Sequence, residues 1–244
     1  MKRILLTTVS LGVLGVLSPA LGADLPYAKA PVVAPQVYDW TGFYVGGFGG
    51  GGLGNHNYNN ALGPAGFANF TANYNSTGTI GGGEAGYNWQ SGSVLVGIEG
   101  DGFWSGIKGN DATTQQLGVI DQSNLRWGGT LRARGGVTVD RLLLFFTGGW
   151  AYGDILHTST AAGFPVDQFS NHQSGLTAGG GIAYAITNNV IGKIEYRYYD
   201  LGRYNRVGNP LTPNGQLPYT VDNTYSVVTL GLDFKFGGPV VAKY

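Results

Sequence analysis

The lengths of the connections between extended segments constrain this chain more than any other feature. Between Trp40 and Phe236, apolar and polar residues alternate with a period of two, which is typical of β-strands. The alternation predicts eight strands, at about 42–51, 77–90, 94–106, 125–137, 142–153, 174–186, 190–199 and 224–236. The connections are alternately long and short: long at about 52–76, 107–123, 154–173 and 200–222, and short at 91–93, 138–141 and 187–189.

This pattern of strands and connections predicts an all-β fold, an eight-stranded antiparallel up-and-down transmembrane β-barrel. Such barrels have tight periplasmic turns at one rim and long extracellular loops at the other. Because the first connection is long, the first strand runs outward. We therefore expect both ends of the barrel to lie in the periplasm.

Charged residues fall on one face of the expected strands, and acids and bases nearly balance. The acids are Glu84, Glu99, Asp101, Glu195 and Asp233, and the bases are Arg126, Arg132, Arg134, Lys193, Arg197 and Lys235. Aromatic residues recur near the strand ends, at Trp40, Phe43, Trp89, Trp104, Trp127, Trp150, Tyr152 and Phe236. Aromatic girdles and a polar interior are typical of membrane barrels. The alternative is an ordinary sheet with one solvated, charged face.

An eight-stranded barrel is only wide enough for its own side chains. Leaving a charge buried and unpaired costs several kcal/mol, so the interior charges must pair. We expect a network on the second, third and fourth strands that joins Arg126, Arg132 and Arg134 to Glu84, Glu99 and Asp101. Such a network plugs the lumen, although a narrow or gated water path stays open as an alternative.

The N-terminus predicts export. Lys2 and Arg3 precede an apolar run at 4–17, which Ser18 and Pro19 end. This is the layout of a signal peptide at 1–22, cleaved after Gly22 or Ala23, with an uncleaved anchor helix as the alternative. We expect a Pro-rich periplasmic linker at 23–39, the barrel at 40–236 and a short periplasmic tail at 237–244. The chain has no cysteine, which excludes disulfides and a lipoprotein anchor.

Several motifs resemble the immunogenic outer-membrane proteins, often labelled porin-family, of Gram-negative bacteria, which are grouped with the OmpA-like and OmpX-like barrels. The motifs are DWTGFYVG at 39–46, VGIEGD at 96–101, GTLRARGG at 129–136, TGGWAYG at 147–153, KIEYRYYD at 193–200 and the expected mature start ADLP at 23–26. The resemblance implies an abundant component of the outer membrane. It also implies surface exposure, a part in barrier integrity and sometimes passage of small solutes.

The last strand resembles the C-terminal signal that the barrel-assembly machinery reads. The matching residues are Thr229, Gly231, Phe234 and Phe236. An exposed strand with alternating aromatic residues can pair edge to edge with another sheet. The alternative is a strand that simply turns its aromatic side chains to lipid. Residues 237–244 follow the signal, whereas such proteins usually end at the final Phe.

The sequence predicts no catalytic, cofactor or metal site. His56, His157 and His172 lie in or beside expected loops and share no strand face with acids. The His157-Thr158-Ser159 pattern is similar to the base and nucleophile of an outer-membrane lipid A deacylase, but no orienting acid stands at a suitable spacing. Nothing in the charge balance indicates a nucleic-acid partner.

The favoured function is therefore a non-catalytic, surface-exposed envelope protein. A narrow porin, the deacylase and an adhesin that acts through its loops are the alternatives. The expected partners are outer-membrane lipid and lipopolysaccharide, the assembly machinery during biogenesis, and host or surface ligands at the loops.

Overall fold

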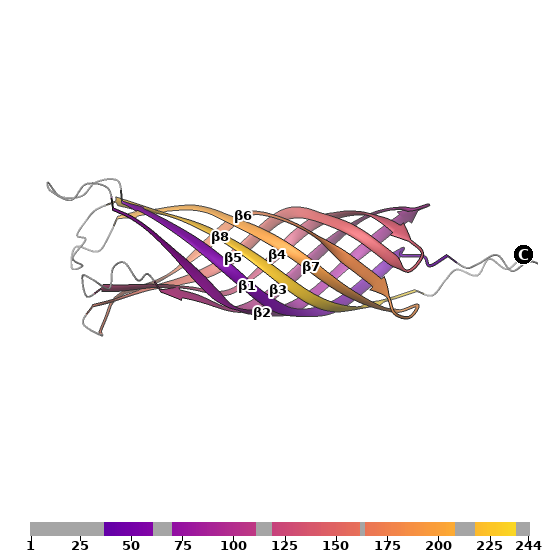
Figure 1. Cartoon of the computed structure of the whole chain (residues 1–244), viewed down its shortest axis with the longest axis horizontal. Coiled ribbons are helices and arrows are strands. Elements are labelled where there is room, and N and C mark those ends of the chain that lie inside the picture. Colours follow the sequence, from indigo (N-terminus) through magenta and orange to yellow (C-terminus); the bar gives the residue numbers. More distant parts are fainter. Residues whose placement is uncertain (1–36, 61–69, 111–118, 162–163, 208–217, 238–244) are drawn as a thin grey trace, which may run out of the picture. The chain divides into compact units, whose positions relative to one another are not determined.

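The computed structural model describes residues 37–60, 70–110, 119–161, 164–207 and 218–237. These residues form one closed antiparallel barrel in which each strand pairs with its neighbours in sequence and β1 pairs with β8 (Figure 1). The strands are β1 Gly42–Asn60, β2 Phe70–Ser91, β3 Val94–Asn110, β4 Val119–Val139, β5 Leu142–Ala161, β6 Phe164–Ala185, β7 Val190–Val207 and β8 Pro218–Lys235. The expected eight-stranded up-and-down fold is confirmed.

The strands extend well beyond their expected ends at one rim. β1 continues to Asn60 and β2 begins at Phe70, so much of the expected loop at 52–76 is paired strand. The expectation of a long loop at 154–173 is wrong, because β5 and β6 remain paired up to Ala161 and Phe164. The cause is a change in the outward residues. Beyond the apolar stretch they become polar, such as Asn55 on β1 and Thr77 on β2, so the apolar alternation fades while the backbone pairing continues.

The two rims of the barrel differ. At the rim called here the turn end lie Gly42, Lys235 and three tight turns, around Gly92, Asp140 and Asn188. At the opposite rim, called the loop end, lie Asn60, Asn110, Ala161 and Val207. Figure 1 shows the two rims at opposite ends of the barrel. The expected loop residues 61–69, 111–118, 162–163 and 208–217 lie outside the described residues.

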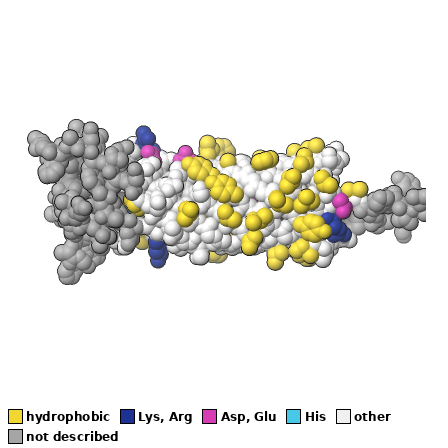
Figure 2. Space-filling view, viewed as in Figure 1, with side chains coloured by type: hydrophobic (Ala, Val, Ile, Leu, Met, Phe, Trp, Pro, Cys, Tyr) yellow, Lys and Arg dark blue, Asp and Glu magenta, His cyan; other side chains and the backbone are white. Residues whose placement is uncertain are grey.

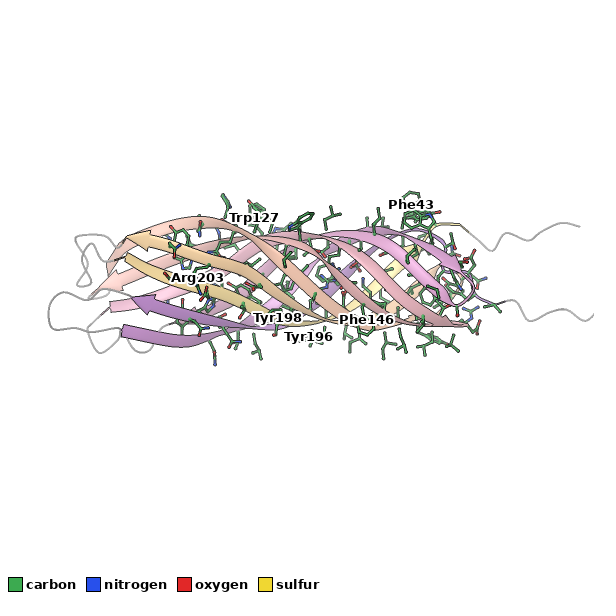
Figure 3. All side chains as sticks on the ribbon, turned by 90° about the horizontal axis from the view of Figure 1, so that it is seen from above. Phe43, Trp127, Phe146, Tyr196, Tyr198 and Arg203 are labelled. Carbon is green, nitrogen blue, oxygen red and sulfur yellow. The ribbon has the colours of Figure 1, made fainter. Side chains whose placement is uncertain are left out.

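Outward side chains form an apolar belt that begins at the turn end. In β5 this belt runs from Leu142 to Tyr152, close to the roughly ten residues that a tilted strand needs to cross a bilayer. Figure 2 shows hydrophobic side chains over the turn-end part and the middle of the barrel, and Figure 3 shows Phe43 and Phe146 on its outside. Trp104 and Phe146 are among the most exposed, at 75% and 76%. Within the described residues, no helix is long and apolar enough to cross a membrane.

Trp40 departs from the expected aromatic girdle. The girdle residues Phe43, Trp89, Trp104, Trp127, Trp150, Tyr152 and Phe236 all face outward and are at least partly exposed. Trp40 is instead 1% exposed and lies among apolar side chains at the turn end. It precedes the first strand, so the strand period could not assign its direction.

Inward side chains stack in layers along the barrel axis. Nearest the turn end is an apolar layer around Trp40, with Leu95, Leu143, Phe145 and Ile191. A charged layer follows, and beyond it comes a second apolar layer of Phe48, Ile80, Phe103, Ile107, Leu125, Ile155, Tyr199 and Val227. The sequence pattern did not separate these layers, because apolar inward residues such as Phe103 and Ile155 are interleaved with glycine.

Candidate functional site: the barrel interior and its outer rim

The centre of the charged layer is Arg132 on β4. Its guanidinium forms an ion pair with Glu99 on the adjacent β3, its direct cross-strand partner. Nη2 also lies 3.2 Å from Asp101 Oδ2, and Nη1 lies 2.5 Å from Glu195 Oε1 on β7. All four side chains are buried. Arg132 therefore joins two non-adjacent parts of the barrel wall through the lumen.

Two bases on β7 complete the charged layer. Lys193 Nζ lies 2.5 Å from Glu84 Oε1, 3.3 Å from Glu99 Oε2 and 3.8 Å from Asp233 Oδ2. Arg197 lies 2.8 Å from Glu195 and 3.2 Å from Asp101, and its guanidinium stacks over the Phe48 ring at 4.6 Å. Each base faces several carboxylates, so the charges are shared across the lumen rather than paired one to one.

Arg134 takes part through a residue that the sequence analysis missed. Tyr44 on β1 donates its hydroxyl hydrogen to Glu99 Oε2 at 2.6 Å, and Arg134 Nη1 donates to the Tyr44 oxygen at 3.2 Å. The Arg134 guanidinium also lies 3.9 Å from the centre of the Phe145 ring. Thr130 and Thr147 were missed as well. They donate to Asp101 and Glu195, at 2.5 Å and 3.1 Å. Strand parity was the available signal, since all three residues occupy inward positions.

The expectation for Arg126 is wrong. A β-bulge shifts the register between Leu125 and Trp127, and Arg126 points outward from it with 42% of its side chain exposed. Its partner is Asp154 on β5, at 2.5 Å between Nη2 and Oδ2. A bulge inserts one residue and reverses the facing of the residues beyond it, so a strict period of two placed Arg126 in the lumen.

Lys235 also lies apart from the charged layer. Its Nζ donates to the backbone oxygen of Asp39 and lies 4.7 Å from the centre of the Tyr38 ring, at the turn end. Arg141 faces the same ring at 5.5 Å. Burial raises the pKa of Tyr38 to about 12, so its hydroxyl stays protonated and donates to the Asn188 backbone oxygen at 3.2 Å.

The segment before β1 closes the turn end. Trp40 Nε1 donates to the Asp140 backbone oxygen at 3.1 Å, and the Trp40 amide donates to Gln90 Oε1 at 2.7 Å. The Tyr38 amide donates to Asp140 Oδ1. We call Tyr38, Asp39 and Trp40 the N-terminal plug. The expected linker at 23–39 thus has ordered residues at its end, while 23–36 lie outside the described residues.

A polar cluster lies inside the barrel towards the loop end. His56 is 1% exposed, with Nδ1 2.6 Å from Asn223 Oδ1 and Nε2 3.0 Å from Ser76 Oγ. Asn223 in turn donates to Gln173 at 3.0 Å. The sequence analysis placed His56 beside a loop, whereas it is a buried strand residue with hydrogen-bonding partners.

The other two histidines lie on opposite faces of the barrel wall. His157 Nδ1 lies 2.9 Å from Ser123 Oγ, an inward residue of β4, so His157 faces away from the outer surface where a lipid substrate would lie. The Ser159 side chain is outside the described residues. His172 faces outward, with Nδ1 3.2 Å from Asp154 Oδ1. The statement that no histidine shares a face with an acid is therefore wrong for His172.

The four residues of the expected assembly signal lie on β8 and directly after it, and they face both sides of the barrel wall. Thr229 and Gly231 point inward, and Phe234 and Phe236 are exposed on the outside. The Phe236 amide donates to the Phe43 carbonyl at 2.8 Å, so backbone pairing of the first and last strands continues past Lys235. Within the described residues, no group of three His, Asp or Glu side chains is placed to hold a metal ion.

Comparison with known sequences gives one family match. A family model described as "Outer membrane protein beta-barrel domain" matches residues 25–236. The 31 kDa outer-membrane immunogenic protein of Brucella melitensis is 33% identical over 242 residues, which cover 89% of this chain and 93% of that protein. The 25 kDa outer-membrane immunogenic protein of Brucella abortus is 31% identical, over 82% of this chain and 85% of its own.

The matches among solved structures are more distant in sequence. The outer membrane protein OprG from Pseudomonas aeruginosa has a TM-score of 0.49 and 12% identity, and the match covers 81% of this chain and 97% of that chain. AlkL, solved by solid-state NMR in lipid bilayers, has a TM-score of 0.45 and 14% identity, over 86% and 97% of the two chains.

Proposed function

Because the chain belongs to the family of outer-membrane proteins with a β-barrel domain, and so lies in the outer membrane, we propose that it is a non-catalytic, surface-exposed envelope protein. Its barrel serves as an anchor that holds the loop end outside the cell, and it does not conduct solutes. The observation that carries this proposal is the filled lumen, in which a buried charged layer lies between two apolar layers.

The layered interior supports an anchor rather than a channel for two reasons. A solute would have to displace ion pairs that hold opposite walls together, such as Arg132 with Glu195. It would also have to cross the apolar layers, and hydrophobic constrictions exclude water from a pore. The N-terminal plug adds a third obstruction at the turn end, where Trp40 is hydrogen-bonded to Asp140 and Gln90.

Surface exposure is supported by the relatives, which are named immunogenic outer-membrane proteins. It is tested by inserting a short epitope tag in the 208–217 segment and, as a control, at Asn188 in a turn of the opposite rim. Antibody should label intact cells only for the 208–217 insertion, and both insertions after the envelope is permeabilised. If antibody instead labels intact cells that carry the tag at Asn188, the orientation is opposite to the one proposed.

Planar-bilayer recording separates the anchor from the narrow porin. We expect no reproducible conductance steps from the purified, folded protein. A variant with Phe103→Ala and Ile155→Ala thins the apolar layer without touching the ion pairs, and shows how the recording responds when this obstruction is reduced. Reproducible steps from the unaltered protein would overturn the anchor proposal in favour of the porin.

The deacylase alternative receives a separate test. Mass spectrometry of lipid A from cells that express the protein should show unchanged acylation, since His157 faces the barrel interior. Loss of an acyl chain that depends on His157 would show that the protein is an enzyme.

A further inference from the structure

A row of side chains crosses three adjacent strands on the outside of the barrel. Trp127 on β4 is the cross-strand partner of Asp154 on β5, which is the partner of His172 on β6. Arg126 joins the row because the bulge at Leu125 turns it outward. We call Arg126, Trp127, Asp154 and His172 the outer row.

The outer row lies where the apolar belt ends on the loop-end side. Below it, towards the turn end, the outward residues of β4 to β6 include Leu131, Trp150 and Leu176. On these strands, Arg126, Asp154 and His172 are the first outward Arg, Asp or His side chains beyond these. In Figure 3, Trp127 lies on the outside of the barrel near its middle. Because aromatic girdles mark the edge of the hydrocarbon region, the outer row lies at the level of lipid headgroups.

The Arg126 guanidinium is held in place rather than freely mobile. Its Nε donates to Asp154 Oδ2 at 2.7 Å, and its Nη2 donates to Ser170 Oγ at 2.8 Å. Asp154 is fully buried beneath it, and His172 Nδ1 approaches the other carboxylate oxygen. Nη1 of Arg126 has no partner within the part of the chain that the structure describes. The arrangement thus presents an oriented, partly exposed donor group at the headgroup level.

Aromatic rings lie beside this donor, and the strand register places a second cation nearby. The His172 ring stacks on Tyr152 at 5.9 Å with an angle of 19°, and Trp127 lies 5.6 Å from Tyr152. Exposed Lys108 lies on the neighbouring β3, opposite Asn124. Flat rings pack against sugar faces, while guanidinium and ammonium groups bind phosphate. Lys108 also leaves a positive charge that Asp154 does not neutralise.

We propose that the outer row binds the phosphorylated sugar headgroup of an outer-leaflet glycolipid. Arg126 donates to the phosphate, Lys108 adds positive charge, and Trp127 with Tyr152 contacts the sugar ring. Asp154 is a positioning residue that orients Arg126. The partner is a membrane lipid rather than free phosphate, because the site opens sideways at the level of the bilayer.

A matched pair of double variants tests the proposal. Arg126→Gln with Asp154→Asn removes the guanidinium together with its buried partner, so no orphan charge remains and the net charge of the row is unchanged. Arg203→Gln with Asp222→Asn removes the exposed ion pair of β7 and β8, whose Nε to Oδ1 distance is 2.9 Å. Figure 3 shows Arg203 nearer the loop end, and the structure gives it no ring partner within the described residues. Both variants should fold, as judged by the gel-mobility shift on boiling.

Native mass spectrometry in detergent, with a diphosphorylated lipid A and its dephosphorylated form, gives the readout. We expect the first variant to bind the phosphorylated lipid at least about fivefold more weakly than the unaltered protein, and the second to bind within about twofold of it. The dephosphorylated lipid should not distinguish the two proteins: it should bind the unaltered protein and the first variant equally weakly. Equal binding by the two variants, or no preference for the phosphorylated lipid, would overturn the proposal. Full competition by millimolar inorganic phosphate would contradict the choice of a lipid.

Discussion

Arg132 Nη1 lies 2.5 Å from Glu195 Oε1, so that β4 and β7, which share no backbone hydrogen bonds, are joined through the centre of the barrel. Both side chains are fully buried. The pair therefore braces opposite parts of the wall, and Glu99 and Asp101 supply the remaining partners of the same guanidinium.

Removing this brace should destabilise the barrel strongly. Arg132→Ala leaves three carboxylates without their shared partner, and breaking a buried ion pair costs about 3–5 kcal/mol. The free energy of unfolding, measured by urea titration in lipid vesicles, should fall by that amount. Arg203→Ala is the control, because its pair with Asp222 is exposed to solvent and should contribute little to stability. Equal losses from the two variants would show that the lumen charges do not brace the wall.

Two glycines of β2 should differ in their tolerance of alanine. At Gly86 an added Cβ would lie 2.4 Å from the Tyr44 hydroxyl oxygen and 2.7 Å from the Ile98 carbonyl, so Tyr44 must leave Glu99. At the outward Gly83 the nearest atom would be 3.6 Å away. Gly86→Ala should cost about 1–3 kcal/mol of unfolding free energy, and Gly83→Ala about 0.5 kcal/mol or less. The same urea titration measures both, and a larger loss at Gly83 would contradict the inward packing of Tyr44.

The N-terminal plug should protect the turn end of the lumen. The chain has no cysteine, so Leu95→Cys, at a fully buried position beside Trp40, introduces a single thiol. A water-soluble maleimide should label this thiol much faster when Trp40→Ala is also present. A Val96→Cys variant, exposed on the outside of the same strand, controls for reagent access to the belt. Unchanged labelling of the Leu95→Cys thiol would mean that Trp40 does not seal this end.

The aromatic end of β8 should matter for assembly more than for stability. If Phe234 and Phe236 are read by the assembly machinery, their replacement by alanine lowers the folded protein in the outer-membrane fraction several-fold. Phe146→Ala is the control, since Phe146 is at least as exposed on the belt but lies on β5. Equal losses for both sets would indicate only lost contact with lipid.

The sequence predicted the fold well because a period of two is robust over long stretches. That period places Glu99 and Arg132 on the same face of the sheet, and the two residues are cross-strand partners. The prediction failed where the period is interrupted. The bulge at Leu125 turned Arg126 outward, and Trp40 lies before the first strand. Tyr44 was missed because a simple alternation of apolar and polar residues treats tyrosine as aromatic and ignores its polar hydroxyl. The residue nevertheless occupies an inward position.

Contacts through the lumen lie beyond what such a pattern contains. The alternation assigns Lys193 to the interior, but not its approach to Glu84 on β2. That distance depends on the barrel's shear and on the side-chain conformations of several strands at once. The pairing of His172 with Asp154 on the outer face could not be predicted from the alternation either, because it depends on the register between β5 and β6.

The paired strands beyond the belt change how far the protein reaches. From Asp154 to Ala161, β5 rises roughly 18 Å along the barrel axis, at about 3.3 Å per residue and a tilt near 40°. In the proposed orientation, the barrel therefore also raises its loop end well above the surface of the membrane. A large molecule that approaches from outside would then meet that rim first, while the buried charged layer lies nearer the turn end. Substitutions at that rim should therefore cost little folding free energy, since the buried ion pairs and apolar layers are elsewhere in the barrel.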